Sequence, residues 1–194
     1  MLAKSVFKET GWVFSHNLAH KCCKYAGIRS KARKYTYKKA GEEHIAFPNE
    51  VQGNWNATHP VEIVVSDMTI FKNNGRNWEW TLLVDTFNNE ILAHQATPIQ
   101  GSTKPYYHCL EQLKLLAGKK NEEQTPQVVF HTDQGSVYSS QAFRQAHEHY
   151  NILRSMSRGG TPTDNPIIEA LNGWMKEELY LDFGLASTED VPLL

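Results

Sequence analysis

Three acidic residues stand where the chain could bring their carboxylates to one point. Asp67 ends the apolar run 61–66, and Asp133 ends a second run over residues 127–132. Glu169 lies early in a helical stretch, with thirty-five residues between it and Asp133. Carboxylate oxygens are the ligands that Mg²⁺ prefers, and its octahedral shell keeps room for phosphate oxygens of a substrate. The spacing therefore predicts a divalent-metal site that acts on phosphates.

Longer motifs surround all three acids. Residues 65–69 read V-S-D-M-T, residues 131–140 read H-T-D-Q-G-S-V-Y-S-S, and residues 155–160 read S-M-S-R-G-G ahead of Asp164-Asn165 and Glu169. They resemble the V-T-D-I-T, H-S-D-R-G-x-Q-Y-x-S and S-M-S-R-K-G segments of IS3-type insertion-sequence transposases, which belong to the retroviral-integrase superfamily. The resemblance runs from Val65 to Tyr180, and Val64 departs from it because the family usually carries tryptophan there.

The resemblance implies a specific chemistry for these acids. Asp67, Asp133 and Glu169 would be the catalytic, metal-binding DDE triad, holding two Mg²⁺ ions, with Mn²⁺ as the alternative ion. The activity implied is transposition, in which the strand is cleaved at the ends of the element and then joined to target DNA. The partners implied are DNA and further copies of the chain, which would form a homo-oligomer on DNA.

Positive charge is concentrated at the beginning of the chain. The first forty residues hold ten of the twenty Lys and Arg residues and one acid, although the whole chain has a net charge of −1. Such a basic arm attracts phosphate groups, and charge alone leaves open a solvated arm without a ligand. The resemblance favours DNA, and we expect the arm residues Lys31, Arg33 and Lys34 to contact it.

Turn-forming residues and composition indicate how the chain is organised. Residues 1–40 form a partial, basic segment similar to a helix-turn-helix, with one helix from Ser15 to about Ala26. Residues 41–60 lack sustained periodicity and are predicted to be a linker, and residues 61–194 form the catalytic core. With 40% hydrophobic residues, no membrane-length apolar run and no apolar signal region, we expect a cytoplasmic protein.

The core alternates between strand and helix patterns. Strand patterns cover residues 61–66, 78–86, 90–95, 127–132 and 152–155, with Asn88-Asn89 as a hairpin turn. Helix patterns cover residues 105–117 and 139–150, and a last helix carries Glu169. This order predicts an α/β fold with a mixed five-stranded sheet flanked by helices, and the resemblance specifies a ribonuclease-H-like fold.

The last predicted helix has an apolar and a polar side. We expect Thr163 or Asp164 to cap it, and an apolar stripe to be buried: Ile167, Ile168, Leu171, Trp174, Met175 and Leu179. Glu169, Asn172 and Lys176 share the polar side, where Lys176 would face DNA and hold a phosphate. Arg158 is the second core residue expected to contact DNA, and Asp85 is expected to be a structural turn acid.

The two ends of the chain bear on its activity. The chain stops at Leu194, where the IS3-type pattern continues through another helix and a basic tail, and most of the leading helices are also absent. We therefore expect a catalytic core that is truncated at both ends. Two alternative functions stay open at this point, namely an inactive remnant that only binds DNA and a ribonuclease-H-like nuclease.

Overall fold

The computed structural model describes residues 15–27, 45–120, 127–158 and 164–189, together with Gly11 and Val191. The chain divides into two compact units, Met1–Lys39 and Ala40–Leu194. In the first unit, helix α2 (His16–Tyr25) is capped by the Ser15 hydroxyl, which accepts a hydrogen bond of 3.2 Å from the Leu18 N–H. The predicted helix is confirmed, whereas Lys31, Arg33 and Lys34 lie outside the described residues.

A five-stranded sheet forms the centre of the larger unit, in the strand order β3-β2-β1-β4-β5. The strands are β1 (Ile63–Asn73), β2 (Arg76–Asp85), β3 (Ile91–Thr97), β4 (Val128–Thr132) and β5 (Ile152–Met156). The helices are α3 (Lys104–Ala117), α4 (Gln141–Gln145) and α5 (Pro166–Leu181). The first three strands are antiparallel, while β4 and β5 run parallel to β1. The predicted mixed sheet is therefore confirmed.

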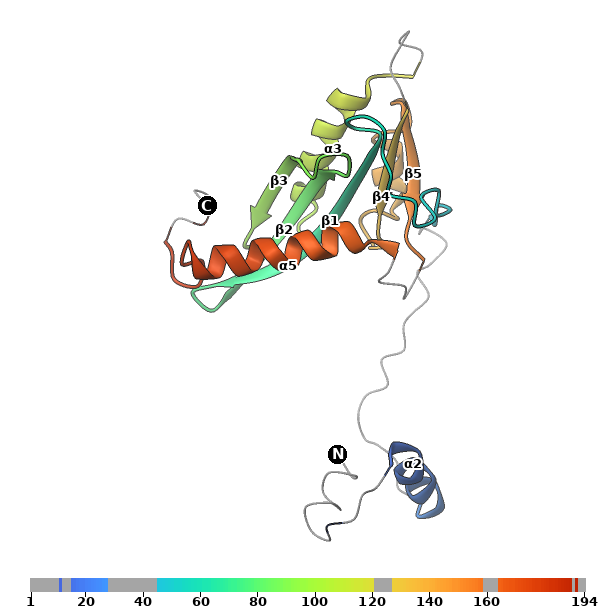
Figure 1. The fold of residues 1–194 in the computed structure, drawn as a ribbon, viewed down its shortest axis with the longest axis vertical. Coiled ribbons are helices and arrows are strands. Elements are labelled where there is room, and N and C mark those ends of the chain that lie inside the picture. Colours follow the sequence, from blue (N-terminus) through green and yellow to red (C-terminus); the bar gives the residue numbers. More distant parts are fainter. Residues whose placement is uncertain are drawn as a thin grey trace. The chain divides into compact units, whose positions relative to one another are not determined.

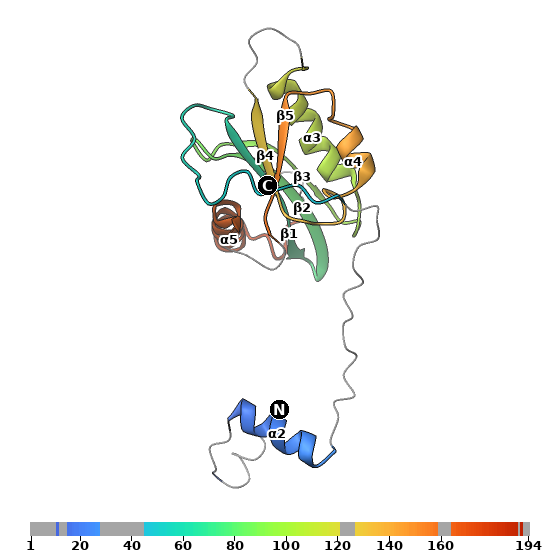
Figure 2. The same cartoon turned by 90° about the vertical axis from the view of Figure 1, so that its right-hand side faces the viewer.

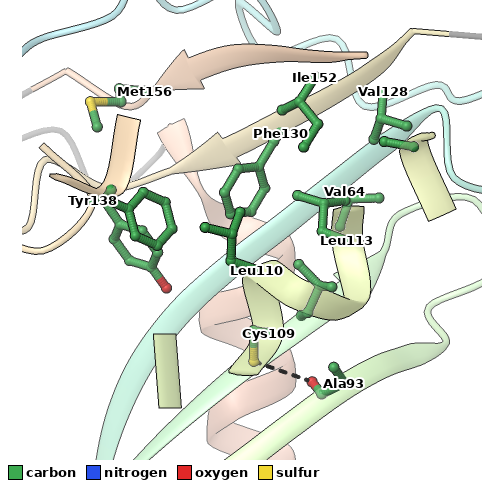
Figure 3. Packing of buried hydrophobic residues seen from close by; sticks show 13 residues of the cluster. Val64, Ala93, Cys109, Leu110, Leu113, Val128, Phe130, Tyr138, Ile152 and Met156 are labelled. Carbon is green, nitrogen blue, oxygen red and sulfur yellow. Dashed lines mark hydrogen bonds between the residues drawn. The ribbon is translucent and has the colours of Figure 1, made fainter. Parts of the chain in front are cut away.

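Helices cover both faces of this sheet (Figures 1 and 2). Helices α3 and α4 pack over one face on a cluster that includes Val64, Leu110 and Phe130 (Figure 3). Helix α5 packs over the other face on a cluster that includes Val65 and Ile168. Adjacent residues of β1 enter opposite clusters because side chains alternate along a strand. None of the described helices has the length and apolar content that a membrane crossing requires.

The hairpin of β1 and β2 is longer than the sequence predicts. Asn74 and Gly75 have φ angles of +47° and +73°, which suits a two-residue turn between twisted strands. Pairing then runs without a break from Asn73 opposite Arg76 to Val64 opposite Asp85. The expectation that Asp67 ends its strand is wrong, because the six residues after it remain paired with β2.

Helix α4 is shorter than the predicted helix over residues 139–150. The Ser140 hydroxyl caps it by accepting a hydrogen bond of 3.2 Å from the Phe143 N–H. Beyond Gln145 the backbone tightens, since His147 bonds to the carbonyl of Arg144 and Tyr150 to that of His147. Bonds over three residues form tight turns rather than continuing an α-helix.

Residues 45–56, which we call the strap, pack against the sheet although they fall in the segment predicted as a linker. The Met156 N–H of β5 bonds to the Pro48 carbonyl at 3.2 Å, and the Ile45 N–H bonds to the Ser139 carbonyl at 2.7 Å. Val51 is buried, and the Trp55 ring meets the edge of the His131 ring at 5.2 Å between centroids. The strap is thus fixed to the part of the sheet formed by β4 and β5.

Candidate active site

Asp67 and Asp133 are brought together by the register of two parallel strands. The pairing of β1 with β4 ends where Ser66 lies opposite Thr132, so the two aspartates are the next residues on adjacent strands. Neighbouring strands lie about 4.8 Å apart, which leaves the carboxylates close to one another. Accordingly, the charge of Asp133 adds to the effect of burial in raising the pKa of Asp67.

The loop after β4 holds the Asp133 carboxylate in place. The Gly135 N–H donates a hydrogen bond of 2.9 Å to Asp133 Oδ1. A Cβ atom on Gly135 would lie only 2.8 Å from that oxygen, so a larger residue would displace the carboxylate. Burial nevertheless raises the pKa of Asp133, which means that the single hydrogen bond does not offset the loss of water.

The surroundings of Asp67 disfavour the charged form of its carboxylate. Burial and the charge of Asp133 are the main reasons that its pKa is raised to about 6, and the charge of Glu169 adds to them. Lys176 and the Met68 backbone act in the opposite direction. Two adjacent, partly buried carboxylates with raised pKa values indicate a site with excess negative charge, which a cation would neutralise.

A polar seam along α5 sets the position of this helix on β1. Side chains at every fourth helical residue reach β1: Asn172 Nδ2 donates to Asp67 Oδ2 at 3.1 Å, Lys176 Nζ donates to Thr69 Oγ1 at 2.8 Å, and the Tyr180 hydroxyl donates to the Lys72 carbonyl at 2.9 Å. From Asn172 to Lys176 the helix advances about 6 Å, and from Asp67 to Thr69 the strand advances about 6.6 Å, so helix and strand stay in step there. The next step along the strand, from Thr69 to Lys72, spans three residues. The seam places Glu169 one turn before Asn172.

Glu169 lies in the first turn of α5 and is exposed. Its charge acts on Asp67, which places it on the side of the sheet where the aspartates lie. Within the described ranges, no three His, Cys, Asp or Glu side chains are grouped closely enough to hold a metal ion as they stand. The ligand role of the three acids therefore stays a prediction, in which Asp67 and Asp133 form the fixed pair and Glu169 the outer member.

The predicted buried stripe of α5 is partly wrong. Ile168 is fully buried, but Trp174 is 59% exposed, while Asn172 from the expected polar side is only 5% exposed. The reason is that the polar side of the helix covers the acidic site rather than facing solvent. Asn172 is the functional residue that sequence reasoning missed, although its place one turn after Glu169 was a usable signal.

The two core residues that are expected to contact DNA, Lys176 and Arg158, already bind other residues of the protein. Lys176 bonds to Thr69, as described above, and Arg158 forms an ion pair of 2.8 Å with Asp164. The Arg158 side chain remains 71% exposed, so one edge of its guanidinium still faces solvent. Its role in DNA binding, like that of Lys176, stays a prediction.

The expected capping of α5 by Asp164 is wrong. The cap residue is Asn165, which makes no side-chain cap hydrogen bond, and Pro166 occupies the first turn. The Asp164 carboxylate binds Arg158 instead, because a guanidinium offers two parallel charge-assisted donors. The other candidate cap, Thr163, lies outside the described residues.

Asp85 and His131 are two further polar residues that the fold buries. Asp85 is confirmed as a turn acid, since it accepts hydrogen bonds from the N–H groups of Val61 (2.9 Å) and Phe87 (3.0 Å). His131 is fully buried, and its Nδ1 lies 2.8 Å from the Ser155 hydroxyl. Burial lowers the pKa of His131 to about 4, which keeps the ring neutral near pH 7.

Comparison with known proteins identifies relatives of this core. InsK, assigned as the transposase of insertion sequence element IS150 in Escherichia coli (strain K12), is 35% identical over 144 residues. The alignment covers 73% of this chain and 48% of InsK, so the chain spans about half the length of that relative. The resemblance to insertion-sequence transposases is thereby supported by an alignment over most of this chain.

Solved structures share the fold. The simian T-cell lymphotropic virus intasome, in complex with PP2A regulatory subunit B56 gamma, contains a chain that matches with a TM-score of 0.56 and 21% identity, over 98% of this chain and 62% of that one. The trimeric HTLV-2 integrase catalytic core domain, in complex with magnesium, matches with a TM-score of 0.51 and 22% identity, over 72% and 79%. These matches confirm the ribonuclease-H-like fold.

A family model, described as the integrase core domain, matches residues 57–162. This range includes Asp67, Asp133 and the loop around Gly135. It covers more than half of the chain, and it coincides with the sheet and the two aspartates that the strand register brings together. The chain therefore belongs to the integrase core domain family.

Proposed function

We propose that the protein is a transposase core that cleaves DNA at the ends of an insertion sequence and transfers the freed strand to target DNA. The observation that carries this proposal is the pair of partly buried, adjacent carboxylates of Asp67 and Asp133 at the end of the β1–β4 ladder. The similarity to InsK and the match to the integrase core domain support the same activity.

The residues of the site suit divalent cations. Asp67 and Asp133 offer carboxylate oxygens in a region of excess negative charge, and Glu169 offers a third carboxylate from α5. We assign these three residues as ligands of two Mg²⁺ ions, with Mn²⁺ as the alternative, and HTLV-2 integrase is an example of this fold with magnesium bound. When bound, such ions supply Lewis-acid activation of an attacking oxygen and neutralise charge on a leaving one.

The other side chains of the site bind and orient. Asn172 holds Oδ2 of Asp67 through its amide, which fixes the direction of that carboxylate. Lys176, two turns after Glu169, carries positive charge beside the acids and would contact a DNA phosphate after leaving Thr69. Arg158 would contact DNA through the exposed edge of its guanidinium. Water is the first attacking group and a 3′-hydroxyl of DNA the second.

The remaining assignments concern partners. The basic arm, residues 1–40, would bind DNA by its charge through Lys31, Arg33 and Lys34. The protein would act in the cytoplasm as a homo-oligomer on element ends and target DNA.

Labelled terminal DNA and the Asp133→Asn variant test the catalytic proposal. We expect the parent to cleave and join DNA with Mg²⁺, and the variant to lose both activities by more than about 100-fold, because replacing a metal ligand exceeds the 10–100-fold loss typical of groups that only support one. DNA binding should be nearly unchanged. Glu177→Gln is a natural control, because Glu177 is an exposed residue of α5 and its replacement removes one negative charge in the same way.

The products separate the proposal from its two alternatives. Joined product supports a transposase, cleavage without joining supports a nuclease, and binding without either reaction supports a remnant. Equal cleavage by Asp133→Asn and the parent would exclude Asp133 as a ligand.

The salt dependence of binding tests the role of the arm. If half of its eight basic residues between Lys21 and Lys39 contact phosphates, the logarithm of affinity should fall with the logarithm of salt at a slope of roughly −3 to −4. Deleting residues 1–40 should flatten this slope, as measured by fluorescence anisotropy between about 50 and 200 mM salt. An unchanged slope would show that the arm is only a solvated appendage.

A further inference from the structure

The Asp164 carboxylate joins three separate segments of the larger unit. Its Oδ2 accepts hydrogen bonds from the backbone N–H of Arg158 (2.9 Å), from Arg158 Nε (2.8 Å) and from Asn49 Nδ2 (3.3 Å). Its Oδ1 accepts another from Arg158 Nη2 at 2.8 Å. We call this group the Asp164 clamp. It ties the exit of β5 and the strap to the residues that begin α5.

The Asp164 carboxylate of the clamp is buried and electrostatically satisfied. Asp164 is only 6% exposed, and its hydrogen bonds with the side chain and backbone of Arg158 hold its pKa well below the usual range. Further bonds fasten the same segments: the Glu50 N–H donates to the Ser155 hydroxyl at 2.9 Å, and the Ser157 N–H bonds to the Thr132 carbonyl at 3.0 Å. The clamp is therefore anchored to β4 next to Asp133.

The beginning of α5 packs on the sheet through the buried Ile168 but lacks a polar anchor of its own. Its cap residue Asn165 makes no side-chain cap hydrogen bond, although it is only 5% exposed. Pro166 follows, and its ring restricts the backbone while supplying no N–H. Stiff backbone thus connects Asp164 to Glu169, which lies five residues later and whose N–H bonds to the Asn165 carbonyl at 3.4 Å.

The two ends of α5 are held in different ways. The polar seam fixes α5 from Asn172 onward, but Glu169 precedes the seam and is exposed. A ligand on a first turn held only by the packing of Ile168 would lose binding free energy whenever that turn shifted, whereas groups that orient a ligand are typically worth 10–100-fold in metal affinity. The Asp164 clamp adds polar support on the N-terminal side.

We propose that Asp164, held by Arg158 and Asn49, is a positioning residue that sets the first turn of α5 so that Glu169 can join Asp67 and Asp133 as a metal ligand. This inference rests on the proposed metal-binding role of Glu169. It assigns to the strap a part in the active site, because Asn49 belongs to the strap.

Binding of Mn²⁺ to the full chain without DNA tests the inference, measured by calorimetry and by the spin-resonance signal of free Mn²⁺. We expect Asp164→Asn to weaken binding about 10-fold. Glu169→Gln should weaken binding at least as much. The double variant should bind no more weakly than Glu169→Gln alone, because the clamp acts through Glu169. Glu177→Gln, with the same charge change on an exposed site of α5, should bind like the parent.

Asn49→Ala provides a milder variant in case Asp164→Asn fails to fold. It keeps the ion pair of Arg158 with Asp164 and removes the bond from the strap to Asp164, together with the bond that Asn49 Oδ1 accepts from the Gln52 N–H inside the strap. A loss of about 3-fold is expected, again only when Glu169 is present. Circular dichroism at the temperature of the binding experiment establishes that each variant is folded.

The outcomes separate this inference from the proposed function. If Glu169→Gln and Asp67→Asn weaken Mn²⁺ binding while Asp164→Asn and Asn49→Ala do not, the role of the clamp is overturned and the metal site stands. An equal loss from Asp164→Asn with and without Glu169 would also overturn it, since the effect would then be general. If Glu169→Gln and Asp67→Asn bind like the parent, the metal site itself is overturned.

Discussion

Asp67 and Asp164 are both largely withdrawn from water, yet the protein treats their charges in opposite ways. Asp164 has a guanidinium, an amide and a backbone N–H around it, which lower its pKa. Asp67 has Asn172 and a second carboxylate, and its pKa rises to about 6. The comparison teaches that the fold satisfies a buried charge where it serves structure and leaves it unsatisfied where a cation is expected to bind.

Replacing each aspartate by asparagine should change stability in opposite directions. The folded pKa of Asp67 lies above the unfolded value near 3.8, so its stabilising contribution is lost as the pH rises through about 6. At pH 7.5 without divalent ions, Asp67→Asn should therefore raise the free energy of unfolding by about 1 to 3 kcal/mol. Asp164→Asn should lower the melting temperature.

Urea denaturation and thermal melting of the two variants measure this difference. Asp85→Asn is a useful control. Asp85 is a buried acid that accepts two backbone hydrogen bonds, so its replacement should lower the stability of the protein. The comparison breaks if Asp67→Asn is less stable than the parent in the presence of a chelator.

Arg154 extends the comparison to a buried positive charge away from the acids. It is 5% exposed, lies over the rings of Phe47, Phe130 and Phe143, and donates one hydrogen bond of 3.0 Å to Thr132. Its Nε and Nη1 have no hydrogen-bond partner among the described residues, and burial lowers its pKa to about 10. Replacing such a charge by an apolar side chain of similar size is often neutral or stabilising.

We therefore expect Arg154→Met to be as stable as the parent or more stable by up to about 2 kcal/mol. Arg154→Ala should lose about 2 to 4 kcal/mol because it leaves a cavity among the rings. Chemical denaturation of both variants measures the two effects. A loss for Arg154→Met as large as that for Arg154→Ala would mean that the charge itself stabilises the core.

A smaller effect, on the pH dependence of stability, is expected from His147. Burial and the charge of Arg154, with smaller contributions from Lys120 and Lys114, lower its pKa to about 4. The unfolded histidine binds a proton near pH 6.5, so stability is complete above that pH and is lost as the pH falls toward 4. The expected slope from this residue is up to about 1.4 kcal/mol per pH unit.

Denaturation midpoints of His147→Gln and the parent between pH 4 and 7 measure this slope. His131 has a pKa of about 4 as well, so the variant should keep the contribution of His131 and lose that of His147. Identical pH profiles would show that His147 is not protonated on unfolding in this range.

The sequence was sufficient to predict the sheet because its signals are local or belong to ordered motifs. Strand patterns and the motifs around Asp67 and Asp133 identified the two aspartates that the register of β1 and β4 places together. The predicted first strand ends too early, at Asp67, because apolar and polar residues alternate only weakly after it. The Asn74-Gly75 pair is nevertheless a strong hairpin signal.

Contacts between distant segments were not predictable in the same way. The contact of Asn172 with Asp67 joins residues 105 positions apart, and that of Asn49 with Asp164 joins residues 115 apart. Helical periodicity assigns a side chain to a polar or an apolar face, but it does not tell which polar face covers another polar group. This explains why Asn172 was expected to be exposed and Asp164 was expected to be a cap.

The strap has a consequence for the behaviour of the protein in concentrated solution. Strand β5 lies at one edge of the sheet, and an open edge is a template on which other chains can add strands and aggregate. The Pro48 carbonyl engages the Met156 N–H, but proline has no N–H to offer in return, so the ladder stops there. The strap thus also prevents other chains from adding strands at the β5 edge. A chain that begins after residue 56 should therefore self-associate during purification.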